Sequence, residues 1–128
     1  MQRKKKSPAA SPAADSSRPL LDLIVKSLDQ DKAEDIVTID LAGKSSFADY
    51  MVIATGRSTR QVAAMAEHLK ERIKATGNKQ VHAEGLPQAD WVLIDAGDVV
   101  AHLFRPEVRA FYNLEKMWAA DIRDQATA

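Results

Sequence analysis

The chain has 128 residues, which suits one domain, and it contains no cysteine, so disulfides, thiolate nucleophiles and zinc sites built on sulfur are excluded. Its formal net charge is zero, but five of the 18 basic and one of the 18 acidic side chains lie in residues 1–19, which leaves 13 basic and 17 acidic ones for the rest. Because nucleic-acid binding relies on clustered Lys and Arg, the acidic remainder favours a basic protein as the partner. No apolar run is long enough to span a membrane, and we expect a cytoplasmic protein.

Residues 1–19 are rich in Lys, Ser, Ala and Pro, a composition typical of disordered tails because it offers little apolar surface to offset chain entropy. We expect this basic tail to precede a single domain at 20–124, with a short C-terminal tail at 125–128. The run K-K-K at 4–6 is compatible with contact to RNA or another anionic surface, although a solvated extension explains it more simply. Any direct RNA contact is therefore expected only in the N-terminal tail.

The first expected element of the domain is a helix from Pro19 to about Gln30, because proline suits the first turn and leucine and isoleucine recur at spacings of three and four. Two β-branched stretches, 35–41 and 48–56, predict strands that are close enough in sequence to pair as antiparallel neighbours. Ser58 and Gln61 form a capping box for a second helix, whose apolar positions repeat until Gly77 offers a stop.

Three further strands are expected at 80–84, 91–95 and 98–104, before a last helix that begins at Pro106 and carries less polar positions as far as Ile122. The order of elements is αββαβββα. It predicts a single α/β or α+β domain, with a mixed sheet of about five strands flanked by helices.

The four residues D-A-G-D at 95–98 join two of these strands so closely that they predict a β-hairpin. Alanine fits poorly in the left-handed backbone of a two-residue turn at 96–97, so a four-residue loop is favoured. Either loop places Trp91 opposite His102 and Ile94 opposite Val99.

Side chains alternate between the two faces of this hairpin. One face is wholly apolar and should lie on the core: Val92, Ile94, Val99, Ala101 and Leu103. The other face is mixed, with Asp95 and Asp98 at its tip: Trp91, Leu93, Val100, His102 and Phe104. Such a mixture is typical of a partner interface, but also of a sheet face covered by the C-terminal helix, and the pattern does not decide between them.

A metal site and a catalytic site are both disfavoured by the spacing. Asp95, Asp98 and His102, with Glu84 nearby, are spread along a strand ladder and do not converge on one ion. The stretch T-G-R-S at 55–58 resembles an anion cradle at a helix N-terminus, but it lacks the second glycine and the lysine of a phosphate-binding loop. We therefore expect no metal, no cofactor and no catalytic residue.

Three separated blocks closely resemble the ribosomal silencing factor RsfS family, also called Iojap: A-D-Y-M-V-I-A-T-G-R-S-T-R-Q-V (48–62), A-E-G-L-P-Q-A-D-W-V-L-I-D-A-G-D-V-V-A-H-L-F (83–104) and R-A-F-Y-N-L-E-K-M-W (109–118). The resemblance covers about residues 20–120. It implies a fold related to nucleotidyltransferases but without catalysis. It also implies binding to the large ribosomal subunit, through the basic fourteenth large-subunit ribosomal protein on the inter-subunit face. Bound there, such a protein prevents the small subunit from joining and represses translation; when free, it can form a homodimer.

Carried over by motif position, the resemblance implies partner-binding roles for Glu84, Trp91, Asp95 and Asp98, with Arg109, Tyr112 and Glu115 on the final helix as weaker candidates. Each residue also has a purely structural explanation: the tryptophan can be half core, the tyrosine can pack under the sheet, and the last helix can pair its own charges. Ala96 and Met51 stand where the family commonly has a larger residue and Phe. The alternative function is a nucleotidyltransferase-like, nucleotide-binding enzyme that uses the 55–58 junction.

Overall fold

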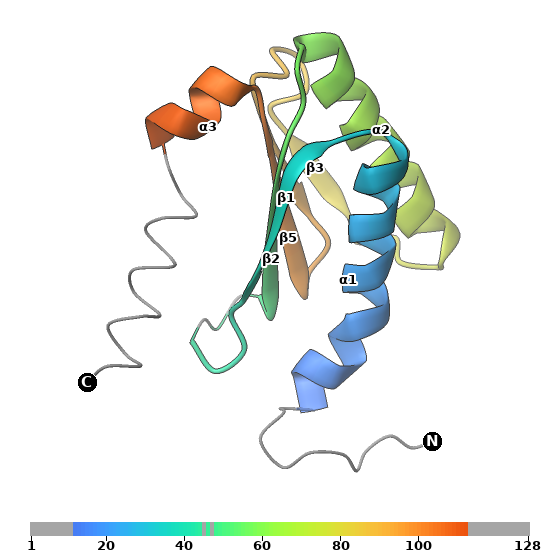
Figure 1. The fold of residues 1–128 in the computed structure, drawn as a ribbon. Coiled ribbons are helices and arrows are strands. Elements are labelled where there is room, and N and C mark those ends of the chain that lie inside the picture. The colour runs from blue at the N-terminus through green and yellow to red at the C-terminus, as the bar shows by residue number, and fades with distance from the viewer. Residues whose placement is uncertain (1–11, 45, 47, 113–128) are drawn as a thin grey trace, which may run out of the picture.

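The computed structural model describes residues 12–44, 46 and 48–112, with side chains from residue 17 to residue 110 of these (Figure 1). The elements are α1 Pro12–Gln30, β1 Glu34–Asp40, β2 Tyr50–Thr55, α2 Thr59–Ala75, β3 His82–Glu84, β4 Trp91–Asp95, β5 Val99–Phe104 and α3 Pro106–Tyr112. Their order is the predicted one. The predicted continuation of the last helix to Ile122 lies outside the described residues.

The five strands form one mixed sheet in the order β1-β2-β5-β4-β3. The central pair, β2 and β5, is parallel, and the other three pairs are antiparallel, including the predicted pair of β1 and β2. A parallel pair requires a crossover, and α2 lies in the segment that connects β2 to the hairpin of β4 and β5. The predicted fold class, an α+β domain with a five-stranded mixed sheet, is confirmed.

Helices α1 and α2 pack side by side on one face of the sheet (Figure 1). The hairpin face that the sequence assigned to the core is buried under them, as predicted. The main contributors to this core are Leu21, Ile24 and Leu28 of α1, Val62, Met65, Leu69 and Ile73 of α2, and Val52, Val92, Ile94, Val99, Ala101 and Leu103 of the sheet.

The predicted start of the first helix is wrong, because α1 begins at Pro12 and carries Pro19 in its interior. An internal proline removes one helical hydrogen bond and usually ends a helix. Here the turn before it is fixed by a tertiary contact: Ser17 is buried, and its Oγ donates a hydrogen bond to Oδ2 of Asp49 at 2.5 Å. Residues 12–19 are therefore helical rather than part of a tail.

The predicted register of the hairpin is also wrong, by two residues. Trp91 pairs with Phe104, and Leu93 pairs with His102. The N–H of Ala96 donates to the carbonyl of Val99 at 3.0 Å, which leaves residues 97–98 as the turn. Gly97 has a φ of +88° and supplies the left-handed position that a type II′ turn needs. Because a shift by two preserves the alternation of side chains, both predicted faces keep their members.

Candidate docking surface on the second face of the sheet

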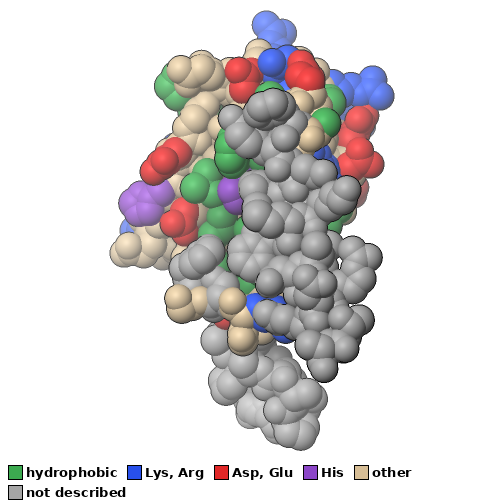
Figure 2. Space-filling model, turned by 90° about the vertical axis from the view of Figure 1, so that its left-hand side faces the viewer, with side chains coloured by type: hydrophobic (Ala, Val, Ile, Leu, Met, Phe, Trp, Pro, Cys, Tyr) green, Lys and Arg blue, Asp and Glu red, His purple; other side chains and the backbone are tan. Residues whose placement is uncertain are grey.

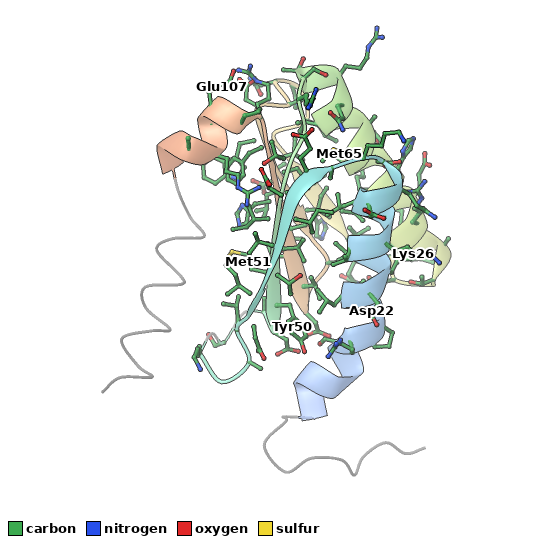
Figure 3. The ribbon with its side chains drawn as sticks, in the orientation of Figure 1. Asp22, Lys26, Tyr50, Met51, Met65 and Glu107 are labelled. Carbon is green, nitrogen blue, oxygen red and sulfur yellow. The ribbon has the colours of Figure 1, made fainter. Side chains whose placement is uncertain are left out.

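The strand register builds three rows of side chains on the face of the sheet that is turned away from α1 and α2, here called the second face. Figure 3 shows Met51 on this side of β2. The first row is Ile39, Met51, Val100, Asp95 and His82; the second is Val37, Ile53, His102, Leu93 and Glu84; the third is Thr55, Phe104 and Trp91. Val108 of α3 packs against the same face.

The second face changes character from one edge to the other. Towards β1, β2 and β5 most of its side chains are apolar and buried, as Ile53 and Phe104 are at 0% and 1% exposure; the exceptions are the buried Thr55 and the partly exposed Val37 and His102. Towards β4 and β3, Trp91 and Leu93 are partly exposed and Glu84 is exposed. Figure 2 looks onto this side of the molecule, where hydrophobic side chains adjoin histidine and acidic ones. An apolar centre beside an acidic margin is the layout of an interface core and its rim.

An aromatic cluster lies in the middle of this surface. Nε1 of Trp91 donates a hydrogen bond to Nδ1 of His102 at 2.9 Å. The Trp91 ring lies 5.0 Å from that of Phe104 and 5.8 Å from that of His102, between centroids, and the last two rings stack at 6.0 Å. Because an indole N–H only donates, Nδ1 must accept, and the imidazole is neutral with its proton on Nε2. Burial lowers the pKa of His102 to about 4, which keeps this neutral form at physiological pH.

The backbone of Trp91 is held by two neighbours. Gly85 has a φ of +92°, and a Cβ there would lie 2.2 Å from the Trp91 carbonyl oxygen, so only glycine fits. At the adjoining residue, Nε of Arg105 donates to Oδ1 of Asp90 at 2.8 Å, and the Arg105 N–H donates to the Asp90 carbonyl at 3.0 Å. The start of β4 is thereby tied to the end of β5.

The four main candidates from the sequence fall on one strip of this surface. Glu84, Trp91 and Asp95 share the second face, and Asp98 occupies the hairpin turn beside them. Both aspartates are exposed; Oδ1 of Asp95 accepts the N–H of Gly97 at 2.9 Å. Because strands rise about 3.3 Å per residue, Trp91 lies roughly 13 Å from Asp95 along β4. The strip is too long for these side chains to act on one small ligand, but it suits a protein surface.

Of the weaker candidates, only Arg109 has a described side chain. Its Nη1 donates to Oγ1 of Thr55 and to the carbonyl of Asp35, each at 2.7 Å. These contacts tie α3 to β1 and β2. The sequence suggested a structural role for Arg109 only through ion pairs with other residues of the same helix. The side chain of Tyr112 and all of Glu115 lie outside the described part.

Two contributors to the surface were missed as functional residues. His102 was assigned to the correct face, but the wrong register placed it directly opposite Trp91 rather than diagonal to it. From this diagonal position the indole N–H still reaches Nδ1, because a tryptophan side chain is long enough to span the larger diagonal separation. The stretch E-G-L-P at 84–87, which follows a predicted strand, indicates a turn at Gly85. The turn by itself does not reveal the close contact of Gly85 with Trp91.

The comparison with known families identifies the family of this chain. The family model described as "Ribosomal silencing factor during starvation", RsfS, matches residues 14–128. The chain belongs to the RsfS family.

Individual relatives of the RsfS chain agree with this assignment. The ribosomal silencing factor RsfS of Zymomonas mobilis is 64% identical over 107 residues, which are 83% of this chain and 80% of that one. The crystal structure of a Chromobacterium violaceum protein superposes with a TM-score of 0.77 at 37% identity, covering 80% of this chain and 85% of that one. A mouse protein named mitochondrial assembly of ribosomal large subunit protein 1 is 38% identical, covering 77% of this chain and 44% of its own length.

RsfS proteins are non-enzymatic ribosomal silencing factors, and the 55–58 junction of this chain gives the enzymatic alternative no support. Oγ of Ser58 accepts the N–H of Gln61 at 3.1 Å, which confirms the predicted cap. Oε1 of Gln61 accepts the N–H of Arg57 at 2.8 Å, and the N–H of Gly56 donates to the Phe104 carbonyl at 2.9 Å. These donors of the supposed cradle are therefore already engaged within the fold.

The described residues of this RsfS chain offer no metal site, since none of their His, Asp and Glu side chains gather in groups of three or more. Nδ1 of His68 lies 2.9 Å from Oδ2 of Asp31, so that this histidine has a partner in the α1 to β1 connection. No helix in the same part of the chain has the length and apolarity to cross a membrane.

Proposed function

We propose that this RsfS-family chain binds the large ribosomal subunit with the β3 and β4 side of the second face. The partner in this proposal is the basic fourteenth large-subunit ribosomal protein on the inter-subunit face. Bound there, the domain keeps the small subunit from joining and represses translation. The name of the mouse relative, which refers to the large subunit, is consistent with that choice of subunit.

The observation that carries the proposal is the combination of a partly exposed Trp91 and Leu93 with exposed carboxylates around them. The carboxylates are those of Glu84, Asp95 and Asp98. A tryptophan in a desolvated pocket is the commonest kind of binding anchor, while carboxylates at the margin attract a basic partner and orient it. The excess of acidic over basic residues in 20–128 acts in the same direction.

The same surface can serve self-association in the free protein. A homodimer formed through Trp91 would hide the docking surface until a large subunit displaces the second copy. We expect the protein to work in the cytoplasm, where it meets free subunits, and we assign direct RNA contact at most to the basic residues near the N-terminus.

Co-sedimentation with separated ribosomal subunits tests the proposal. The protein should pellet with large subunits and not with small ones, and a variant without residues 2–11 should bind as well as the parent. Equal binding to both subunits, or binding that is lost with residues 2–11, would mean that the contact is electrostatic attachment to RNA and not docking through β4.

A further inference from the structure

We propose that His102 is the positioning residue of this surface: its Nδ1 holds the indole of Trp91 in the orientation that the ribosomal partner meets. This role rests on the proposed function, because it concerns how the same surface is kept ready for binding. Neither the sequence motifs nor the family resemblance assigned any role to His102.

The indole is fixed from three directions. His102, diagonally across the β4 and β5 pair, accepts its N–H at 2.9 Å. Phe104, directly opposite in register and almost fully buried, supports the ring at a centroid distance of 5.0 Å. Gly85 lies against the carbonyl of Trp91 and fixes the backbone from which the side chain departs. Of these three contacts, the hydrogen bond constrains the rotation of the ring most directly, because it joins two specific atoms.

The acceptor is in the right chemical form for this task. A protonated imidazole has two donors and cannot accept the indole N–H. His102 sits between Ile53 and Leu93 in its row of the sheet, and burial there disfavours the charged form, which agrees with its lowered pKa. The nearest charged side chain in that row is Glu84, two strands away from β5.

This arrangement also predicts what the partner contacts. Because Nε1 of Trp91 is already used inside the fold, the partner must meet the carbon atoms of the indole and not its donor. A lysine or arginine side chain is suited to such a surface, since it can stack on the ring while its charge faces the carboxylate of Glu84. Fixing the indole in advance removes part of the ordering cost of binding, which corresponds to roughly fivefold in affinity.

Two substitutions separate the hydrogen bond from the ring. His102→Phe keeps an aromatic ring beside Phe104 and removes the acceptor, whereas His102→Asn places an amide oxygen where Nδ1 was. We expect His102→Phe to bind large subunits roughly fivefold more weakly and His102→Asn to stay within about twofold of the parent. In a Trp91→Phe background, which lacks the indole N–H, His102→Phe should cause no further loss.

The state of the indole is read directly from its N–H signal in nitrogen-15 NMR spectra, assigned by its absence in Trp91→Phe. Exchange of this proton with solvent should be slow in the parent and in His102→Asn, and faster in His102→Phe. Unchanged exchange in His102→Phe, or unchanged affinity of that variant while the parent binds, overturns the role of His102 alone. A parent that does not bind large subunits overturns the proposed function, and the role of His102 with it.

Discussion

At the scale of single residues, Trp91 has the largest expected effect on binding. It is the aromatic member of the strip, it is partly exposed, and the exposed Glu84 lies diagonally across from it, opposite Leu93. Truncation of such an anchor commonly costs about 2 kcal/mol or more. Trp91→Ala should therefore weaken binding to purified large subunits by roughly thirtyfold or more, measured by co-sedimentation titration. Circular dichroism checks that the variant is folded, and a folded variant that binds like the parent excludes Trp91 as the anchor.

Asp95 tests the electrostatic part of the surface. Its Oδ1 also accepts the Gly97 N–H, so a charge reversal must be separated from the loss of that bond. Asp95→Asn keeps an oxygen acceptor and should bind a fewfold more weakly, while Asp95→Lys should lose about tenfold or more and depend less on salt. Glu71→Lys makes the same charge change at an exposed position of α2 and should bind like the parent. Equal losses in the Glu71 and Asp95 variants would point to overall charge instead of a local contact.

His102 gives the fold a dependence on pH with a defined sign. Its pKa is about 4 in the folded protein and 6.5 in an unfolded chain, so the unfolded state binds more protons between these values. The contribution of neutral His102 to the free energy of unfolding is complete above pH 6.5. Roughly 3 kcal/mol of it is lost as the pH falls towards 4. Urea unfolding at pH 7 and pH 4.5 measures this loss. The free energy of unfolding should differ less between the two pH values in His102→Phe than in the parent. The same difference in both proteins would rule out His102 as the source.

At the scale of elements, two glycines with positive φ, one on each side of β4, differ in how closely other atoms pack around them. Nothing lies within 4 Å of a Cβ at Gly97, whereas a Cβ at Gly85 would clash with the Trp91 carbonyl. Gly97→Ala should therefore cost only the backbone strain, about 1 kcal/mol, and leave binding unchanged. Gly85→Ala should cost several times more, roughly 3 kcal/mol, and also weaken binding by displacing Trp91. Urea unfolding measures both costs, and equal values would contradict the close packing at Gly85.

The type and order of the elements could be predicted because they depend on local periodicity. The repeat of Val62, Met65, Leu69 and Ile73 specifies a helix face, and the alternation in 91–95 and 99–104 specifies two sheet faces, whatever the rest of the chain does. Element boundaries depend on contacts between distant residues. The helical turn before Pro19 depends on Asp49, 32 positions after Ser17.

The register of the hairpin was missed for a reason that lies in the turn. A two-residue turn on Ala96 and Gly97 suits alanine poorly, which favours the predicted four-residue loop; the structure instead has a two-residue turn on 97–98, with glycine in its first position. In that turn Ala96 stays in the ladder and is buried on the core face. The candidate residues kept their faces, because alternation survives a shift by two. The predicted register also brings Trp91 next to His102, but directly opposite it and not in the diagonal position of the structure, where Phe104 is the residue opposite Trp91.

At the scale of the whole molecule, the two faces of the sheet differ in what covers them. One face is covered by α1 and α2, which supply most of the core (Figure 1), and the other carries the strip, on the side where Figure 2 shows hydrophobic side chains next to acidic ones. The strip, which includes the acidic hairpin tip, lies on the opposite side of the sheet from α1 and α2. A domain that docks by this strip leaves the bulk of its two helices projecting from the ribosomal surface. That bulk is what would exclude the small subunit.

The joining of ribosomal subunits tests this account most directly. Large subunits are incubated with the protein, small subunits are added, and whole ribosomes are separated from free subunits on a sucrose gradient. The parent should leave the subunits apart and migrate with the large one, whereas Trp91→Ala should allow whole ribosomes to form at the same concentration. Whole ribosomes in the presence of the parent, or equal inhibition by Trp91→Ala and the parent, would contradict the docking of this chain through the second face.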